Sequence, residues 1–319
     1  MPMILAELND DVEVLCHRLK CSPEQLLAFF KNPDQYYKEL SVPRRRRSKR
    51  PRTVYEVVDP LRRVQRTVAL SLKPYVAKLG PWVHGFRQGH SILSNAANHS
   101  GGKRLVCTVD LHDFFGTVSV QKVWSVFCRL GAPEQVALTL ARLSTFQGSL
   151  PQGGRASPAL ANLAADELDQ HIARSISPCC VYTRYVDDLA FSGSVVPTEA
   201  EIRSWTQRFG FAVRPGSYCR KTAAAGQYVT GLFVSGGHPR APRSVRRRIA
   251  TFLRFAAKYD VASAAQKTFL HGKRASNPSA ALAYVRGVIN SVRSIEPDLI
   301  KKWTEQLDQI TAPKEVTSL

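Results

Sequence analysis

The segment YTRYVDDLAFSG, residues 182–193, decides the fold class of this chain. It places two adjacent acids, Asp187 and Asp188, between two short apolar runs, which predicts two strands within residues 181–192 that meet at the acids. Neighbouring residues of a plain strand face opposite sides of a sheet, but at a hairpin tip the backbone turns and both side chains can approach one site. Taken alone, an Asp-Asp pair is more typical of an ordinary turn.

A third acid, Asp110, ends another apolar strand, predicted over residues 103–110. Acids are rarely buried unless they are paired or bind a metal. If the hairpin lies beside this strand, three carboxylates converge, and divalent cations would relieve their repulsion. This is the arrangement that a two-metal phosphoryl-transfer site requires, so the sequence predicts a site for two Mg²⁺ ions.

Three segments resemble motifs of the reverse transcriptases and occur in that family's order: VDLHDFFGTVS at 109–119, PQGGRASP at 151–158, and YVDD at 185–188. The resemblance implies an RNA-directed DNA polymerase, a nucleotidyltransferase whose substrates are dNTPs. It implies three catalytic acids, namely Asp110, Asp187 and Asp188. The same acids and the backbone carbonyl of Leu111 are then the expected metal ligands.

The resemblance also implies nucleotide contacts from four side chains: Phe115, Gln152, Lys221 and Arg52. Each has an alternative interpretation. The ring of Phe115 either walls off the 2′ position of a sugar or packs in the core. The turn at Gln152 either seats a nucleotide or template base, or is a capped loop before a helix. Lys221 resembles a lysine that steadies the pyrophosphate leaving group, but surface charge explains it too. Arg52 ends a basic run from residue 44 that is also typical of a solvated linker.

Two short signatures narrow the resemblance to the retron reverse transcriptases: NAANH at residues 95–99 and VTG at 229–231. They imply RNA recognition by five residues, namely Asn95, His99, Val229, Thr230 and Gly231. His99 alone would be interpreted as a structural hydrogen-bonding residue. The likeness covers roughly residues 22–305. It departs from the family pattern at Val186, where alanine is frequent, at Gly154, which replaces an alanine, and at Arg155, which replaces a proline and either contacts phosphate or covers a helix start.

Charge is distributed unevenly along the 319 residues. The formal net charge is +20, although residues 1–43 carry seven acidic and four basic side chains. The excess of positive charge in the remainder favours a polyanionic partner. Arg246, Arg247 and Arg248 lie near the start of a predicted helix, where cations oppose the helix dipole, so phosphate binding explains them better than helix stability does. A solvated helix face is the alternative.

The fold class expected is α+β, a right-hand polymerase with three parts. Residues 1–43 are predicted as an N-terminal helical extension, 44–240 as fingers and palm with an antiparallel sheet plus helices, and 241–319 as an all-α thumb. The main helices are expected at about 22–31, 60–79, 119–130, 133–144, 157–175, 198–209, 242–258, 260–270, 278–294 and 297–311. Single strands are expected at 53–58 and 227–235.

The resemblance implies that the chain copies a cognate structured non-coding RNA from an internal 2′-hydroxyl primer. The product would be branched multicopy single-stranded DNA (msDNA), and the role antiviral defence with a separate effector protein as partner. No apolar run is long enough to span a membrane, the N-terminus does not resemble a signal peptide, and seven cysteines form no C-x-x-C pair, so we expect a cytoplasmic protein and no membrane partner. Another bacterial reverse transcriptase, of intron-encoded or abortive-infection type, and a non-catalytic RNA-binding protein are the alternatives.

Overall fold

The computed structural model describes residues 5, 11–42, 52–270, 273–274 and 277–312. The basic run at 44–50 lies outside this description. By internal contacts the chain divides into two compact units: unit 1 comprises Met1–Asn95 and Arg104–Lys221, and unit 2 comprises Ala96–Lys103 and Thr222–Leu319. Unit 2 therefore includes the VTG segment, which the sequence assigned to the preceding domain. The three-part division at 43 and 240 stays a prediction.

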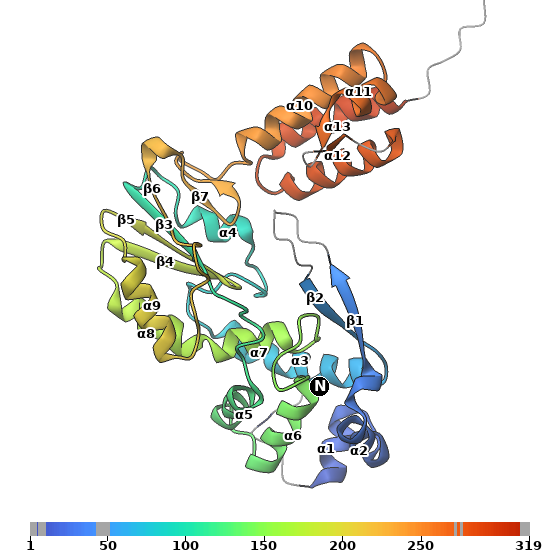
Figure 1. Cartoon of the computed structure of the whole chain (residues 1–319), viewed down its shortest axis with the longest axis vertical. Coiled ribbons are helices and arrows are strands. Elements are labelled where there is room, and N and C mark those ends of the chain that lie inside the picture. The colour runs from blue at the N-terminus through green and yellow to red at the C-terminus, as the bar shows by residue number, and fades with distance from the viewer. Residues whose placement is uncertain (1–4, 6–10, 43–51, 271–272, 275–276, 313–319) are drawn as a thin grey trace, which may run out of the picture. The chain divides into compact units, whose positions relative to one another are not determined.

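A four-stranded sheet carries the predicted acids of unit 1. Its strand order is β4-β5-β3-β6, formed by β3 (Leu105–Asp110), β4 (Cys180–Tyr185), β5 (Asp188–Gly193) and β6 (Cys219–Thr222). Both β4 and β3 pair with β5 in antiparallel register (Figure 1). The central strand β5 is almost wholly buried, which agrees with its apolar sequence. The predicted hairpin and the strand ending at Asp110 are thus confirmed, whereas β6 was not predicted.

Helices form the remainder of the core of unit 1. They are α1 (Val12–Leu19), α2 (Pro23–Lys31), α3 (Leu61–Ala77), α5 (Val120–Arg129), α6 (Glu134–Ser144), α7 (Ser157–Ala164), α8 (Asp166–Ser175) and α9 (Glu199–Arg208), with a 3-10 turn at Pro33–Tyr36. The short helix α4 (Ile92–Ala97) spans the point in the sequence where unit 1 gives way to unit 2. Capping boxes begin α2 and α9, both near the starts that the sequence predicted for these helices: Ser22 pairs with Gln25 and Thr198 with Glu201.

One predicted helix, 157–175, is instead two helices that share Ala165 as a cap. The break allows α8 to turn Asp169 into the core, where it pairs with a strand residue. Ala156 is the N-cap of α7, and the Ser157 hydroxyl donates to the Pro151 carbonyl at 2.9 Å.

A two-stranded sheet joins β1 (Tyr37–Val42) to β2 (Arg52–Val57) in antiparallel register (Figure 1). The second strand was predicted, but the first was not, because most of its residues are exposed and it shows little apolar alternation. Tyr37 anchors β1 by stacking on Phe146 and accepting a hydrogen bond from the buried amide of Gln65 at 2.9 Å.

Unit 2 contains the helices α10 (Arg243–Lys258), α11 (Val261–Lys267), α12 (Pro278–Val292) and α13 (Pro297–Thr311), drawn in orange to red in Figure 1. Its hairpins are β7 (Tyr228–Val229) with β8 (Leu232–Phe233), and β9 (Phe269–Leu270) with β10 (Lys273–Arg274). The predicted helix 260–270 therefore ends early. The predicted strand 227–235 is interrupted, because Thr230 and Gly231 both have positive φ and form a tight turn. In the part of the chain described, no helix is long and apolar enough to cross a membrane.

Candidate active site

The three predicted acids meet where the sheet strands end. Asp110 is the last residue of β3 and lies directly opposite Asp188, the first residue of β5. Asp187 lies in the two-residue turn before β5, and its carbonyl accepts a hydrogen bond from the Leu111 N–H at 2.8 Å. The register and this hydrogen bond bring the acid-bearing ends of two sequence-distant segments together, as the sequence predicted.

The turn that presents Asp187 has an unusual backbone. Val186 has a φ of 62°, a left-handed conformation that a β-branched side chain rarely adopts. Gly85 packs against this turn so closely that an added Cβ would lie 2.5 Å from the Val186 nitrogen. The backbone at Gly85 therefore packs directly against the strained turn, and a glycine is required there because no side chain fits.

Arg184 also holds this turn, through a hydrogen bond to its backbone. The sequence did not indicate this role of Arg184. Its guanidinium donates to the Val186 carbonyl at 3.0 Å and forms a fork with both oxygens of Asp169. It also donates to Asn162, which in turn donates to the Gly85 carbonyl at 2.7 Å. Arg184 and Asp169 are fully buried, so the pair is desolvated and depends on this complete set of hydrogen bonds. A charged residue inside a buried strand was the signal available in the sequence.

The acid cluster is electrostatically crowded. Burial, together with the neighbouring carboxyls of Asp110 and Asp187, raises the pKa of Asp188 to about 8. Arg214 opposes this effect: its guanidinium lies 2.6 Å from an Asp110 oxygen and 3.6 Å from an Asp187 oxygen. The carboxylates thus attract cations, and a protein cation already lies among them.

Within the described residues, no three His, Cys, Asp and Glu side chains form a ready-made metal cage. The donor set nevertheless suits magnesium, which prefers carboxylate oxygens and keeps several waters. Asp110 and Asp188 are direct register partners, so two carboxyl groups face each other at the end of the sheet.

Aromatic rings lie next to the acids along the chain. Phe115 is half-buried and contacts Phe86 and Phe114 edge to face, with ring centroids 6.4 and 5.7 Å apart. Phe86 is 55% exposed and was not predicted as a site residue. Phe114 is buried and packs against Phe211, so it belongs to the core. Phe115 and Phe86 are therefore the rings in this group that a ligand can reach.

The loop that carries Gln152 is fixed against β2. The Tyr55 N–H donates to the Gln152 carbonyl at 2.7 Å, and Gly153 adopts a φ of 113° where an added Cβ would strike the Tyr55 carbonyl. Arg155 has an exposed side chain, while its N–H donates to the buried Gln65 amide at 3.0 Å. The backbone of this loop is thus built into the fold, and the Gln152 and Arg155 side chains are at least partly open to solvent.

The other two predicted nucleotide contacts, Lys221 and Arg52, lie on strands. Lys221 is exposed on β6, the edge strand next to β3. It is the third residue of this four-residue strand. Arg52 begins β2, opposite Val42, and its side chain lies outside the description. Both assignments stay predictions.

The two retron-like signatures consist of buried and open residues. Asn95, His99 and Val229 are buried, whereas Thr230 is half-exposed and Gly231 exposed. In the described structure neither polar atom of the Asn95 side chain has a hydrogen-bond partner. Asn95, His99 and Val229 have little surface open to a ligand, and their assignment to RNA recognition stays a prediction. Thr230 and Gly231 form the accessible tip of their hairpin.

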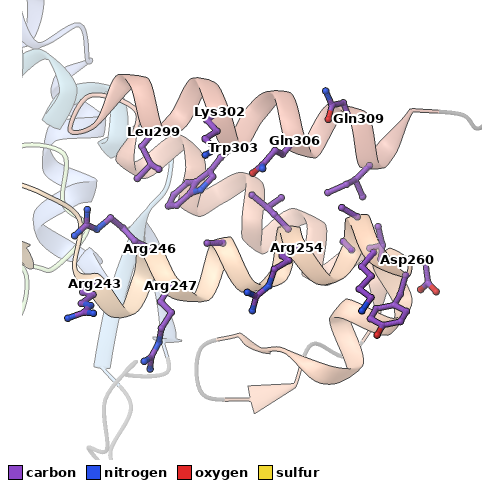
Figure 2. A pocket seen from close by; sticks show the side chains of 18 residues that line it. Arg243, Arg246, Arg247, Arg254, Asp260, Leu299, Lys302, Trp303, Gln306 and Gln309 are labelled. Atoms are coloured by element: carbon purple, nitrogen blue, oxygen red, sulfur yellow. The ribbon is translucent and has the colours of Figure 1, made fainter.

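A basic groove of about 1330 Å³ runs between α10, α11 and α13 in unit 2. Figure 2 shows Arg246 of α10 on the side of Trp303 of α13, whereas Arg243, Arg247 and Arg254 extend from α10 away from α13. The groove has six cationic lining side chains, namely Arg243, Arg246, Arg247, Arg254, Lys258 and Lys302, against one acid, Asp260. A groove of this charge and aromatic content suits a phosphate backbone.

The three arginines predicted to bind RNA are not equivalent. Arg246 forms an ion pair with Glu296 at 3.4 Å, and Arg248 donates to the Tyr284 hydroxyl at 3.3 Å. Arg247 is exposed and lines the groove. Of these three arginines, Arg247 is therefore the best placed to bind phosphate. Arg254, seven residues further along α10, is also exposed and lines the groove.

Comparisons with known proteins agree with this geometry. Residues 42–207 match the family model described as reverse transcriptase (RNA-dependent DNA polymerase). The retron Ec86 reverse transcriptase of Escherichia coli is 31% identical over 225 residues, which cover 68% of this chain and 68% of the relative. The retron Mx65 and Mx162 reverse transcriptases of Myxococcus xanthus are 32% and 28% identical, covering 73% and 96% of this chain and 57% and 68% of the relatives. The chain therefore belongs to the reverse transcriptases, which are RNA-directed DNA polymerases, and among them to the retron type.

Proposed function

We propose that this chain copies a cognate structured non-coding RNA into branched msDNA, starting from an internal 2′-hydroxyl of that RNA. The observation that carries the polymerase chemistry is the register pairing of Asp110 with Asp188, with Asp187 in the adjoining turn. The restriction to one cognate RNA rests on the NAANH and VTG segments and on the retron relatives. Antiviral defence with a separate effector protein, in the cytoplasm, completes the proposal.

Two Mg²⁺ ions are proposed as cofactors, held by Asp110, Asp187, Asp188 and the Leu111 carbonyl. When bound, such ions activate an attacking hydroxyl and stabilise the leaving phosphate. The chain itself keeps the acids in place through the β3–β5 register and the Arg184 network. Gln152, Lys221 and Arg52 are proposed to contact the nucleotide. The sheet-bearing region corresponds to fingers and palm in this proposal, and the α10–α13 region to the thumb.

The proposal is tested with purified protein, Mg²⁺, the four dNTPs and the structured RNA encoded next to the gene. We expect cDNA joined to the RNA through a 2′,5′ linkage, which a debranching enzyme releases and alkali does not. Extension of an annealed DNA primer on unrelated RNA, without any branched product, would instead support the intron-encoded or abortive-infection alternative. RNA binding with no synthesis in either assay would support a non-catalytic protein.

Phe115 is expected to discriminate against ribonucleotides. A deoxyribose can rest against the ring, whereas a 2′-hydroxyl would be buried without a partner, at a cost of about 1–3 kcal/mol. That corresponds to roughly 5- to 150-fold in kcat/KM. Phe115→Ala should therefore raise the GTP to dGTP ratio of kcat/KM on one template.

The matched control is Phe86→Ala, which removes the exposed ring that contacts Phe115. If the ratio stays constant in Phe115→Ala while both values fall together, Phe115 is a packing residue. Phe86 is then the next candidate, because the burial of Phe114 excludes that ring.

RNA affinity is expected to fall steeply with salt, because bound cations release counterions from phosphate. Replacing Arg247 and Arg254 by Gln should flatten the slope of log K against log salt by roughly 1.4 to 1.8 if both touch phosphate. The control replaces Arg293 and Lys301, which are exposed and outside the groove lining. Equal slopes for the two double variants would mean that Arg247 and Arg254 belong to a solvated helix face and do not bind phosphate.

A further inference from the structure

Arg214 reaches into the acid cluster from the segment between α9 and β6. Its guanidinium contacts carboxylates from two different elements, Asp110 at the end of β3 and Asp187 in the turn before β5. One side chain therefore joins the two elements that present the proposed metal ligands.

The backbone beside Arg214 is fixed to the same strand end. The Arg214 N–H donates to the Asp110 carbonyl at 2.8 Å, and the Asp110 N–H donates to the Ser217 hydroxyl at 3.1 Å. Val213 forms an antiparallel bridge with Leu111. Because these contacts hold the main chain, the guanidinium can leave the carboxylates by rotation of its side chain alone.

A guanidinium and a divalent cation need the same carboxylate oxygens. Magnesium takes its oxygen ligands at about 2.0–2.1 Å, and an arginine nitrogen now lies 2.6 Å from Oδ2 of Asp110. The guanidinium and a divalent cation cannot both contact Oδ2 of Asp110 and Oδ2 of Asp187 at once, because two positive charges would then be crowded together. The Arg214 pairs are also partly exposed, with 41% of its side chain accessible, so solvent weakens them enough for a cation to compete.

We propose that Arg214 is a cationic placeholder, which neutralises Asp110 and Asp187 before a metal binds and must withdraw when a divalent cation enters. This inference rests on the proposed metal site. It makes Arg214 a positioning residue that keeps the crowded acids together in the metal-free protein and weakens their affinity for the cation. Removing it should therefore tighten divalent binding.

The test is Mn²⁺ titration of the full-length protein, followed by the electron paramagnetic resonance signal of free Mn²⁺. Arg214→Gln should tighten the acid-dependent dissociation constant roughly three- to tenfold, from the loss of competition and of a nearby positive charge. Arg214→Lys keeps the charge but loses the fork, and should lie between wild type and Arg214→Gln. Arg220→Gln is the matched control, since it removes one exposed charge from the adjoining β6. Asp187→Asn reports which Mn²⁺ belongs to the acid cluster.

The outcomes separate the placeholder from the metal site itself. If Asp187→Asn weakens Mn²⁺ binding but Arg214→Gln binds no more tightly than Arg220→Gln, the placeholder is wrong and the metal site stands. If Asp187→Asn leaves Mn²⁺ binding unchanged, the proposed metal site fails, and the placeholder with it. Thermal unfolding of each variant with EDTA checks that the fold is intact. Should Arg214→Gln not fold, the comparison of Arg214→Lys with wild type decides, because a dissociation constant no tighter than that of wild type contradicts competition.

Discussion

Asp187→Asn is expected to reduce DNA synthesis by at least roughly a thousandfold, while leaving folding and RNA binding nearly unchanged. The substitution keeps the shape of the side chain but removes one of the converging negative charges at the point where the transition state gains charge. The Leu111 N–H would still bind the carbonyl of residue 187, because that contact belongs to the backbone. The measurement is single-turnover extension of a primer on RNA with saturating dGTP.

The control for this change is Asp113→Asn, the same chemical substitution at an exposed acid three residues beyond Asp110. Asparagine also tolerates the positive φ of 42° found there. Asp113→Asn should retain synthesis within a few-fold of wild type. Full activity of Asp187→Asn would overturn the assignment of the catalytic acids.

Arg184→Met should destabilise the protein by about 3–5 kcal/mol, because Asp169 would keep a buried charge without its partner. Chemical denaturation measures this loss. Arg203→Met, which breaks a half-exposed pair with Glu199, should cost at most about 1 kcal/mol.

The double variant Arg184→Met with Asp169→Asn separates stability from positioning. Removing both charges should restore part of the lost stability, but the Val186 carbonyl would still lack its donor. We therefore expect synthesis to stay low even where the double variant is folded. Recovery of activity in step with stability would mean that Arg184 supports the fold generally and does not position the turn.

The sequence predicted the part of the site that lies in strands and short motifs. The pattern predicted the hairpin and the strand that ends at Asp110, whereas the register that places Asp110 opposite Asp188 comes from the structure. Helices with capping boxes were equally predictable, since the cap and its partner lie three residues apart.

The features that the sequence did not predict depend on tertiary contacts. The strand β1 has few apolar residues, and its pairing with β2 is visible only in the folded chain. The division of 157–175 into α7 and α8 was not visible in the sequence, and neither was the pairing of Asp169 with Arg184, fifteen positions further on. In the sequence, Arg214 has no feature that separates it from the other arginines of a basic chain. Only its contact with Asp110 in the folded protein assigns it to the site.

The convergence of the acids on a metal ion is tested most directly by iron-mediated cleavage. Fe²⁺ replaces Mg²⁺ in the full-length protein, and ascorbate with peroxide generates hydroxyl radicals that cut the backbone beside the bound ion. The account predicts cuts next to Asp110 and next to Asp187–Asp188, both suppressed by excess Mg²⁺ and both lost in Asp187→Asn. Cuts at only one of these segments, or cuts that Asp187→Asn does not affect, would contradict a metal site shared by the three acids.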